Sequence, residues 1–349
     1  MERTEILLPA RGRFDLRATV LSRSHDELAP FRWHDGARPL LERAEELPGG
    51  AVYHLAIRPV GDGVVLRVTG EDASEIEALA PLAARVRRSL DLDLDLAPFH
   101  RLCRGDPLLR PAVSLGMGRL LRGTSLFEDL VRSLASASAT DASRLHTTAA
   151  IAALGRRCPV RPELRAFPSP RTLARLDVRR LAGRTGLGRR AAWVSALARE
   201  TDAARLDLGA IERLPGKRLA ARLARLPGMG RPTLAWLLLL LGQHDCPVLD
   251  RATLRFAARA FGPGGAAGCS LERWVARRQP WGGLALWCAR VLDACAGARP
   301  EPDGAGLRRR RPSQPRARRG VRSRGRGTRR PPRRGARRRP PRSGGAPFL

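Results

Sequence analysis

The stretch that decides the fold is residues 223–262, LARLPGMGRPTLAWLLLLLGQHDCPVLDRATLRFAARAFG. An apolar helical pattern ends near Leu226, and the short connection LPGMG leads into a second helical pattern that starts at Arg231. Two glycines in so short a connection allow a tight hairpin. The N–H groups at the start of the second helix favour phosphate oxygens. The sequence therefore predicts two helices joined by a hairpin that can hold a phosphate.

An aspartate follows this unit at a defined place. The loop after the second helix ends in Val248-Leu249-Asp250, and a third amphipathic helix is predicted over residues 252–261. Aspartate just before a helix is a preferred N-cap, so one interpretation of Asp250 is structural. The other is a carboxylate placed at the mouth of a site between the hairpin and the third helix. Asp245, five residues earlier, is a competing carboxylate within the loop.

The hairpin, the apolar helix and Asp250 together resemble the helix-hairpin-helix (HhH-GPD) DNA glycosylase superfamily. The wider context is similar to its 3-methyladenine DNA glycosylase II branch, through the phrases LFEDLV at 126–131, GLGRRA at 186–191 and QPWGGLA at 279–285. The resemblance covers roughly residues 10–298. It implies an enzyme that flips a damaged base out of double-stranded DNA and hydrolyses its N-glycosyl bond.

The resemblance also implies roles for single residues. Asp250 matches the catalytic aspartate, and Trp236 and Pro232 match positions that line the base pocket. Pro232 stands where bifunctional relatives keep a Schiff-base lysine, and Lys217 is the only lysine of the chain, so no covalent lyase step is expected. Trp236 could instead be core packing. The residues expected to contact DNA are those of the hairpin: Leu226, Pro227, Gly228, Met229, Gly230, Arg231 and Thr233.

One departure from the family pattern concerns base flipping. Relatives carry a Gln or Asn followed by a wedge residue after the helix predicted at 127–134, and here Ala137 and Ser138 occupy those places. Two small side chains fill the gap left by a flipped base poorly, and unstacking costs about a few kcal/mol. The sequence therefore indicates a slow or specialised enzyme, or a wedge at another position.

The fold class expected is α+β. Residues 1–98 are expected to form a mixed, antiparallel-sheet domain, with strands at 51–57 and 63–68 and a helix at 71–90. Residues 105–299 are expected to form an all-helical HhH-GPD domain, and residues 300–349, rich in Arg, Pro and Gly, a disordered basic tail. The helices predicted in the second domain cover residues 127–134, 170–176, 189–200, 220–226, 233–242, 252–261 and 284–296.

Both the first 300 residues and the C-terminal segment carry a net positive charge. Of the net +32, residues 301–349 hold +16, from 18 arginines against Glu301 and Asp303, so the other 300 residues are also at +16. A basic globular body indicates a polyanion as partner, usually nucleic acid. The tail is either a non-specific nucleic-acid tether or a solvated or frame-shifted end. A general arginine bias of the gene is the alternative explanation of the charge.

No metal or organic cofactor is expected. The six cysteines contain no CxxC pair, and no cysteine follows Cys288 and Cys295, so a four-thiolate cluster cannot form and both are interpreted as buried apolar residues of a helix. Asp91, Asp93 and Asp95 alternate as on an extended segment and are interpreted as a solvated linker. The resemblance implies that a monovalent cation could sit on hairpin carbonyls. The N-terminus lacks a signal core and no apolar run could span a bilayer, which favours a cytoplasmic, nucleoid-associated monomer without membrane contact.

The function expected is a monofunctional DNA glycosylase acting on damaged bases, alkylated purines above all, in base excision repair. The alternative is a non-catalytic helix-hairpin-helix DNA-binding protein. A third class, an RNA- or chromatin-associated scaffold that uses the basic tail, does not account for the ordered segment that ends in Asp250.

Overall fold

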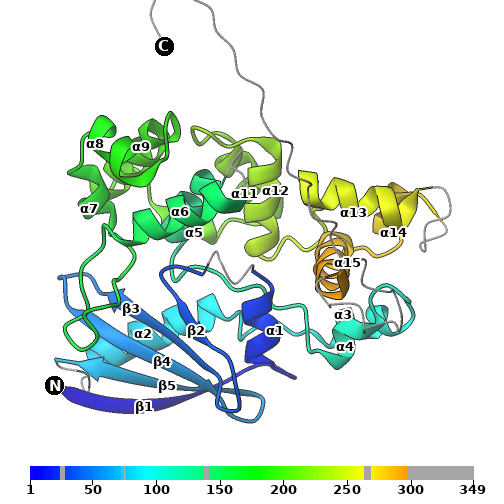
Figure 1. The fold of residues 1–349 in the computed structure, drawn as a ribbon, viewed down its shortest axis with the longest axis horizontal. Coiled ribbons are helices and arrows are strands. Elements are labelled where there is room, and N and C mark those ends of the chain that lie inside the picture. Colours follow the sequence, from blue (N-terminus) through cyan, green and yellow to red (C-terminus); the bar gives the residue numbers. More distant parts are fainter. Residues whose placement is uncertain (24–27, 72, 74–75, 137–140, 263–268, 298–349) are drawn as a thin grey trace, which may run out of the picture. The chain divides into compact units, whose positions relative to one another are not determined.

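The structure is a computed structural model that describes residues 1–23, 28–71, 73, 76–136, 141–262 and 269–297. The expected basic tail and the two expected wedge positions, Ala137 and Ser138, lie outside the described residues. The expected α+β class is confirmed: a five-stranded sheet comes first in the chain and is followed by helices (Figure 1).

The sheet has the strand order β1-β5-β4-β3-β2, and all its neighbours are antiparallel. Alternation of side chains gives it one apolar face, on which Leu66 of β5 lies opposite Ile57 of β4, both essentially unexposed. Helices α1 and α2 contribute to the same core, which is how this face is buried. The bounds are β1 Glu2–Pro9, β2 Arg32–His34, β3 Leu40–Glu46, β4 Val52–Pro59, β5 Gly63–Gly70, α1 Leu16–Leu21 and α2 Ile76–Ser89.

The rest of the described chain is helical. The seven helices expected from periodicity are all present, with ends displaced by a few residues. Six more, most of them short, were not predicted. The bounds are α3 Ala97–Arg104, α4 Arg110–Ser114, α5 Leu126–Ser136, α6 Asp141–Ala152, α7 Pro170–Ala174, α8 Val178–Thr185, α9 Arg190–Asp202, α10 Leu208–Glu212, α11 Gly216–Ala224, α12 Arg231–Leu240, α13 Arg251–Phe261, α14 Leu271–Ala276 and α15 Gly282–Gly297.

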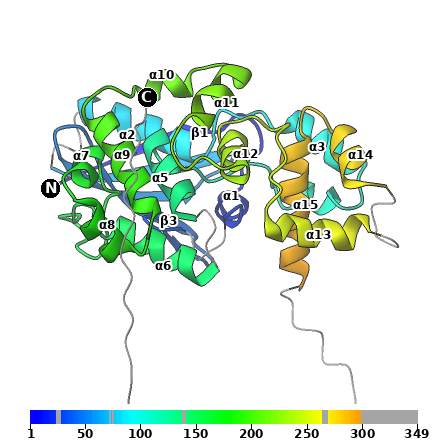
Figure 2. The same cartoon turned by 90° about the horizontal axis from the view of Figure 1, so that it is seen from above.

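The position of helix α12 explains why it is so rich in leucine. Leu237 and Leu238 belong to a core built by α5 to α11, whereas Leu239 and Leu240 belong to a second core built mainly by α3, α4 and α13 to α15. A helix that is apolar on all sides must be buried on all sides. Seen from above, α12 accordingly lies between these two groups of helices (Figure 2). The helix that begins at the hairpin is therefore fixed by both helical cores.

Buried ion pairs join the sheet to helix α5. Arg43 of β3 is fully buried, and its guanidinium lies 3.1 Å from the carboxylate of Glu128 on α5. Arg132 lies 3.3 Å from the same carboxylate. Burial alone would raise the pKa of Glu128, but the two guanidinium groups lower it to about 2. The carboxylate is therefore ionised inside the protein and holds α5 against β3.

One alternation seen in the sequence is absent from the structure, and one interpretation, that of Cys295, is wrong. Asp91, Asp93 and Asp95 do not lie on an extended segment, because the chain turns there and Asp91 has a φ of 52°. Each aspartate instead faces a different arginine: Arg122, Arg87 and Arg11, respectively. Cys288 is buried as expected, but Cys295 on the same helix is exposed. Within the described residues, no helix is both long enough and apolar enough to cross a membrane.

Candidate active site and nucleic-acid interface

The hairpin between α11 and α12 has the expected form. Gly228 has a φ of 79°, the left-handed region that favours glycine, and Gly230 is the N-cap of α12. The N–H of Met229 donates to the carbonyl of Leu226 at 3.2 Å, which closes the turn. Leu226 and Met229 both pack against the helical core. The turn is therefore anchored from below by its two apolar residues.

The outer side of the hairpin carries donors. Gly230 has no side chain to cap α12, so the N–H groups of the first turn are not engaged by an N-cap side chain. Pro227, Arg231 and Pro232 are exposed beside them, and Thr233 is partly buried in the first turn. Uncapped N–H groups next to an arginine are the arrangement that holds a phosphate oxygen. Of the hairpin residues expected to contact DNA, Pro227, Gly230 and Arg231 are exposed at this turn, whereas Leu226 and Met229 pack against the core.

Asp250 is the N-cap of α13. Its Oδ1 accepts a hydrogen bond from the N–H of Thr253 at 2.7 Å, and its side chain is partly exposed. The structural interpretation of this aspartate is thereby realised. It does not exclude a chemical one, since a capping bond to one oxygen leaves the second oxygen of the carboxylate for other partners.

The loop before Asp250 is tied to the start of α15. The carbonyl of His244 accepts hydrogen bonds from the N–H groups of Gly283 and Leu284 at 2.8 and 3.0 Å. A Cβ at Gly283 would lie 2.2 Å from the carbonyl oxygen of Cys246, so only glycine allows this approach. The phrase QPWGGLA thus has a mechanical role: it fixes the loop that places Asp250. Asp245, the competing carboxylate, lies exposed in this loop.

The ring of His244 is part of the same contact. It stacks on Trp281 with ring centroids 4.8 Å apart and an interplanar angle of 17°. Burial lowers the pKa of His244 to about 4, so the imidazole is neutral at physiological pH. Its role is packing rather than charge.

Trp236 lies on α12 and is partly buried. Its ring centroid lies 4.4 Å from that of Trp287 on α15, and both rings pack against the core shared by α13 to α15. Sequence reasoning missed Trp287, because only the fold brings α15 beside α12. It also missed the two arginines that lie on these rings, Arg23 and Arg290.

The single lysine is remote from the start of α12. Lys217 is exposed in the first turn of α11, so a helix of about 1.5 Å rise per residue separates it from the hairpin turn. Pro232 is exposed at the second position of α12. An amine for Schiff-base chemistry is therefore not placed at the hairpin.

Metal ligands do not gather in the part of the chain that the structure describes, where no group of three or more His, Cys, Asp or Glu side chains could hold an ion. A monovalent cation at the hairpin would use main-chain carbonyls. The carbonyls of Leu226 and Gly228 each accept one hydrogen bond within the turn and have a second lone pair, so the residues present fit such an ion.

Known proteins resemble this chain in sequence or in fold. No protein-family model matches the chain. A Mycobacterium tuberculosis protein named "probable bifunctional transcriptional activator/DNA repair enzyme AlkA" is 32% identical over 262 residues, which cover 70% of this chain and 51% of that protein. The chain thus spans about half the length of this curated relative.

Two solved structures share the fold. The 3-methyladenine DNA glycosylase from Archaeoglobus fulgidus aligns with a TM-score of 0.64 at 18% identity and covers 85% of this chain and all of its own. The 8-oxoguanine glycosylase/lyase from Clostridium acetobutylicum, in complex with DNA, aligns with a TM-score of 0.55 at 16% identity and covers 76% of this chain and 98% of its own.

The fold and the hairpin define a helix-hairpin-helix protein with an N-terminal antiparallel sheet. The chain shares its fold with DNA glycosylases and part of its sequence with a DNA repair enzyme, in agreement with the resemblance to the HhH-GPD DNA glycosylase superfamily.

Proposed function

We propose that this chain is a monofunctional DNA glycosylase that excises alkylated purine bases from double-stranded DNA and leaves an abasic site. The observation that carries the proposal is the position of Asp250, one loop beyond the hairpin and at the start of a helix whose preceding loop is fixed on α15. The names of two relatives, a DNA repair enzyme and a 3-methyladenine DNA glycosylase, support the choice of alkylated purines.

The carboxylate of Asp250 supplies the chemistry. When the N-glycosyl bond breaks, positive charge develops at C1′ of the sugar, and an ionised carboxylate stabilises it and orients the attacking water. The capping bond to Thr253 engages Oδ1 and fixes the side chain. Oδ2 is therefore the oxygen that acts on the sugar and the water.

We expect hydrolysis rather than a lyase reaction, because no lysine amine lies at the site. Pro232 has no free amine within the chain, and Lys217 lies at the far end of α11. A covalent Schiff-base intermediate needs a lysine amine at the site. The product is therefore an abasic site in an uncut strand, and borohydride should trap no protein–DNA adduct.

The hairpin binds the DNA backbone. Its uncapped N–H groups and Arg231 hold a phosphate without reading sequence. Trp236 and Pro232 line the place of the flipped base. A relative of the same fold has been seen with double-stranded DNA, which supports duplex DNA as the partner. We propose that the protein is a monomer and that it lies in the cytoplasm, associated with the nucleoid.

The experiment is base release from defined duplexes. Purified protein is incubated with duplexes that contain one alkylated purine, and abasic sites are cleaved with alkali and counted. Wild type should release the base, and Asp250→Asn should not. Base release that survives this substitution would remove Asp250 from the chemistry.

One observation favours the alternative of a non-catalytic DNA-binding protein, namely that the Asp250 carboxylate already serves as an N-cap. The same assay separates the two functions. If no lesion is released while duplex binding is intact, the protein is a binding module.

A further inference from the structure

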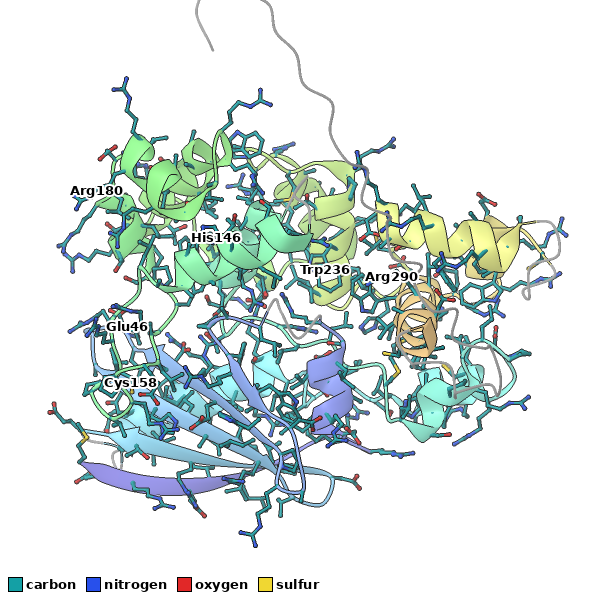
Figure 3. All side chains as sticks on the ribbon, in the orientation of Figure 1. Glu46, His146, Cys158, Arg180, Trp236 and Arg290 are labelled. Carbon is teal, nitrogen blue, oxygen red and sulfur yellow. The ribbon has the colours of Figure 1, made fainter. Side chains whose placement is uncertain are left out.

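Two arginines lie on the two indoles of the base site. The rings of Trp236 and Trp287 contact each other at 4.4 Å between centroids and are tilted by 36°. The guanidinium carbon of Arg23 lies 5.6 Å from the centroid of Trp236, and that of Arg290 lies 3.9 Å from the centroid of Trp287. Both indoles and Arg290 are partly exposed, so a ligand can reach them. Figure 3 labels Trp236 and Arg290, which come from α12 and α15.

Arg23 is held firmly in this place. It is 7% exposed, its Nε donates to the carbonyl of Leu121 at 2.5 Å, and its Nη2 lies 3.6 Å from the fully buried carboxylate of Asp129. The indole N–H of Trp287 donates to the carbonyl of Ser22, the residue before Arg23, at 3.3 Å. Hydrogen bonds therefore fix both the arginine and the neighbouring ring, and the charge cannot move away when a ligand arrives.

The consequence concerns the charge of the base. An indole attracts a cation through its ring face, and here guanidinium groups, which do not lose their protons, already lie on both rings. Asp129 balances the charge of Arg23, so an alkylated purine that carries a positive charge would meet little unused cation–π attraction on either ring and the nearby guanidinium of Arg290. An uncharged base meets no such repulsion and can still stack on the aromatic rings.

We propose that Arg23 and Arg290 are specificity-determining residues that bias the base site toward uncharged damaged bases and against cationic ones. This inference rests on the proposed function, and it narrows the substrate class of that site. It also reverses the simplest expectation from Trp236 alone, because an indole without these arginines would favour the cationic base.

The test compares lesions of different charge in otherwise identical duplexes. Hypoxanthine and 1,N6-ethenoadenine are uncharged, whereas 7-methylguanine in DNA carries a positive charge. Each excision rate is divided by the spontaneous release rate of the same duplex, because the cationic lesion is intrinsically labile. Wild type should accelerate release of the uncharged lesions more than release of 7-methylguanine.

Arg290 is the residue to vary, because removing buried Arg23 would also unpair Asp129. Arg290→Met keeps the apolar stem and removes the charge, and Arg290→Lys keeps the charge. The ratio of uncharged to cationic excision should fall at least about fivefold in Arg290→Met, in line with a cation–π pair of about 1 kcal/mol, and stay near wild type in Arg290→Lys.

Three results would overturn the proposal. Greater acceleration for 7-methylguanine in the wild type would overturn the charge preference while the proposed function stands. An unchanged ratio in Arg290→Met would remove this residue from specificity. Absence of excision from all three lesions would overturn the proposed function, and this inference with it.

Discussion

The indole of Trp193 lies directly against Gly228, so that a Cβ added at the glycine would be 2.2 Å from Cε3 of the ring. Trp193 is on α9, and Gly228 is in the hairpin between α11 and α12. The hairpin is therefore shaped not only by its own glycines but also by an aromatic ring that precedes it by 35 residues. A turn pinned in this way presents its N–H groups in one fixed geometry.

Gly228→Ala should destabilise the protein and weaken DNA binding. The left-handed φ of 79° costs an alanine about 1–2 kcal/mol. The clash with Trp193 adds about 1–3 kcal/mol. Urea denaturation measures the loss of stability, and fluorescence anisotropy with an undamaged duplex measures the loss of DNA affinity.

Gly230→Ala is the matched control. Gly230 has an ordinary φ of −72°, and the nearest heavy atom to its added Cβ is 4.0 Å away, on Pro232. The loss of stability should stay below about 1 kcal/mol, the cost of a poorer N-cap. Equal destabilisation by the two substitutions would show that neither the left-handed φ of Gly228 nor its contact with Trp193 matters.

Asp250→Asn should separate chemistry from folding. Asparagine caps a helix about as well as aspartate, so the stability should change by less than about 1 kcal/mol. Base release should fall by about 100-fold or more, because an amide cannot supply the negative charge or accept a proton from water. Single-turnover excision and thermal melting are the two measurements.

Asp177→Asn is the control for this variant. Asp177 caps α8 through Oδ1 and the N–H of Arg180 at 2.8 Å, the same geometry as at Asp250 but at another helix. It should leave excision unchanged. A comparable loss of activity in Asp177→Asn would mean that helix capping in general, and not the Asp250 carboxylate, limits the reaction.

Gly283→Ala should reduce excision more than it reduces DNA binding. The added Cβ would meet the carbonyl oxygen of Cys246 at 2.2 Å and push the loop that carries Asp250 away from α15. The hairpin is not part of this contact, so affinity for duplex DNA should change little. Gly183→Ala, on α8 with no heavy atom within 4 Å of its Cβ, should leave both properties intact. Loss of affinity in Gly283→Ala equal to its loss of excision would contradict this assignment.

The sequence could predict those parts of the site that depend on residues close together in the chain. The turn at Gly228 and the cap at Asp250 depend on neighbours within a few positions, so a local pattern carries them. The helices missed were mostly short ones such as α4 and α10, whose five residues give too few turns for a periodicity.

The parts that sequence could not predict join distant segments. The contacts of Trp193 with Gly228 and of Trp236 with Trp287 depend on which helices become neighbours, and no local pattern encodes that choice. The alternation of Asp91, Asp93 and Asp95 does not give an extended segment, because the chain turns at Asp91, whose φ is positive. Arg122, Arg87 and Arg11 each pair with one of the three carboxylates.

The ion pair of Glu128 with Arg43 should make stability depend on acid pH. The pKa of Glu128 is lowered from 4.5 to about 2 in the folded protein. A group with a lowered folded pKa stabilises the protein above its unfolded pKa, and this contribution is lost as the pH falls through the folded pKa. The free energy of unfolding should therefore decline between pH 4.5 and pH 2.

Glu128→Gln tests the pair directly. The neutral amide removes one of the two buried counter-charges of Arg43 and leaves Glu45 at 2.6 Å, so it should cost about 1–3 kcal/mol at pH 7. The variant should also lose the part of the acid dependence that Glu128 provides. Glu200→Gln is the control, because Glu200 pairs with Arg205 at 2.7 Å on the surface, where water and salt screen the charges. Urea denaturation of the three proteins from pH 7 down to pH 3 decides, and parallel pH profiles for wild type and Glu128→Gln would show that the pair is not the source of the acid sensitivity.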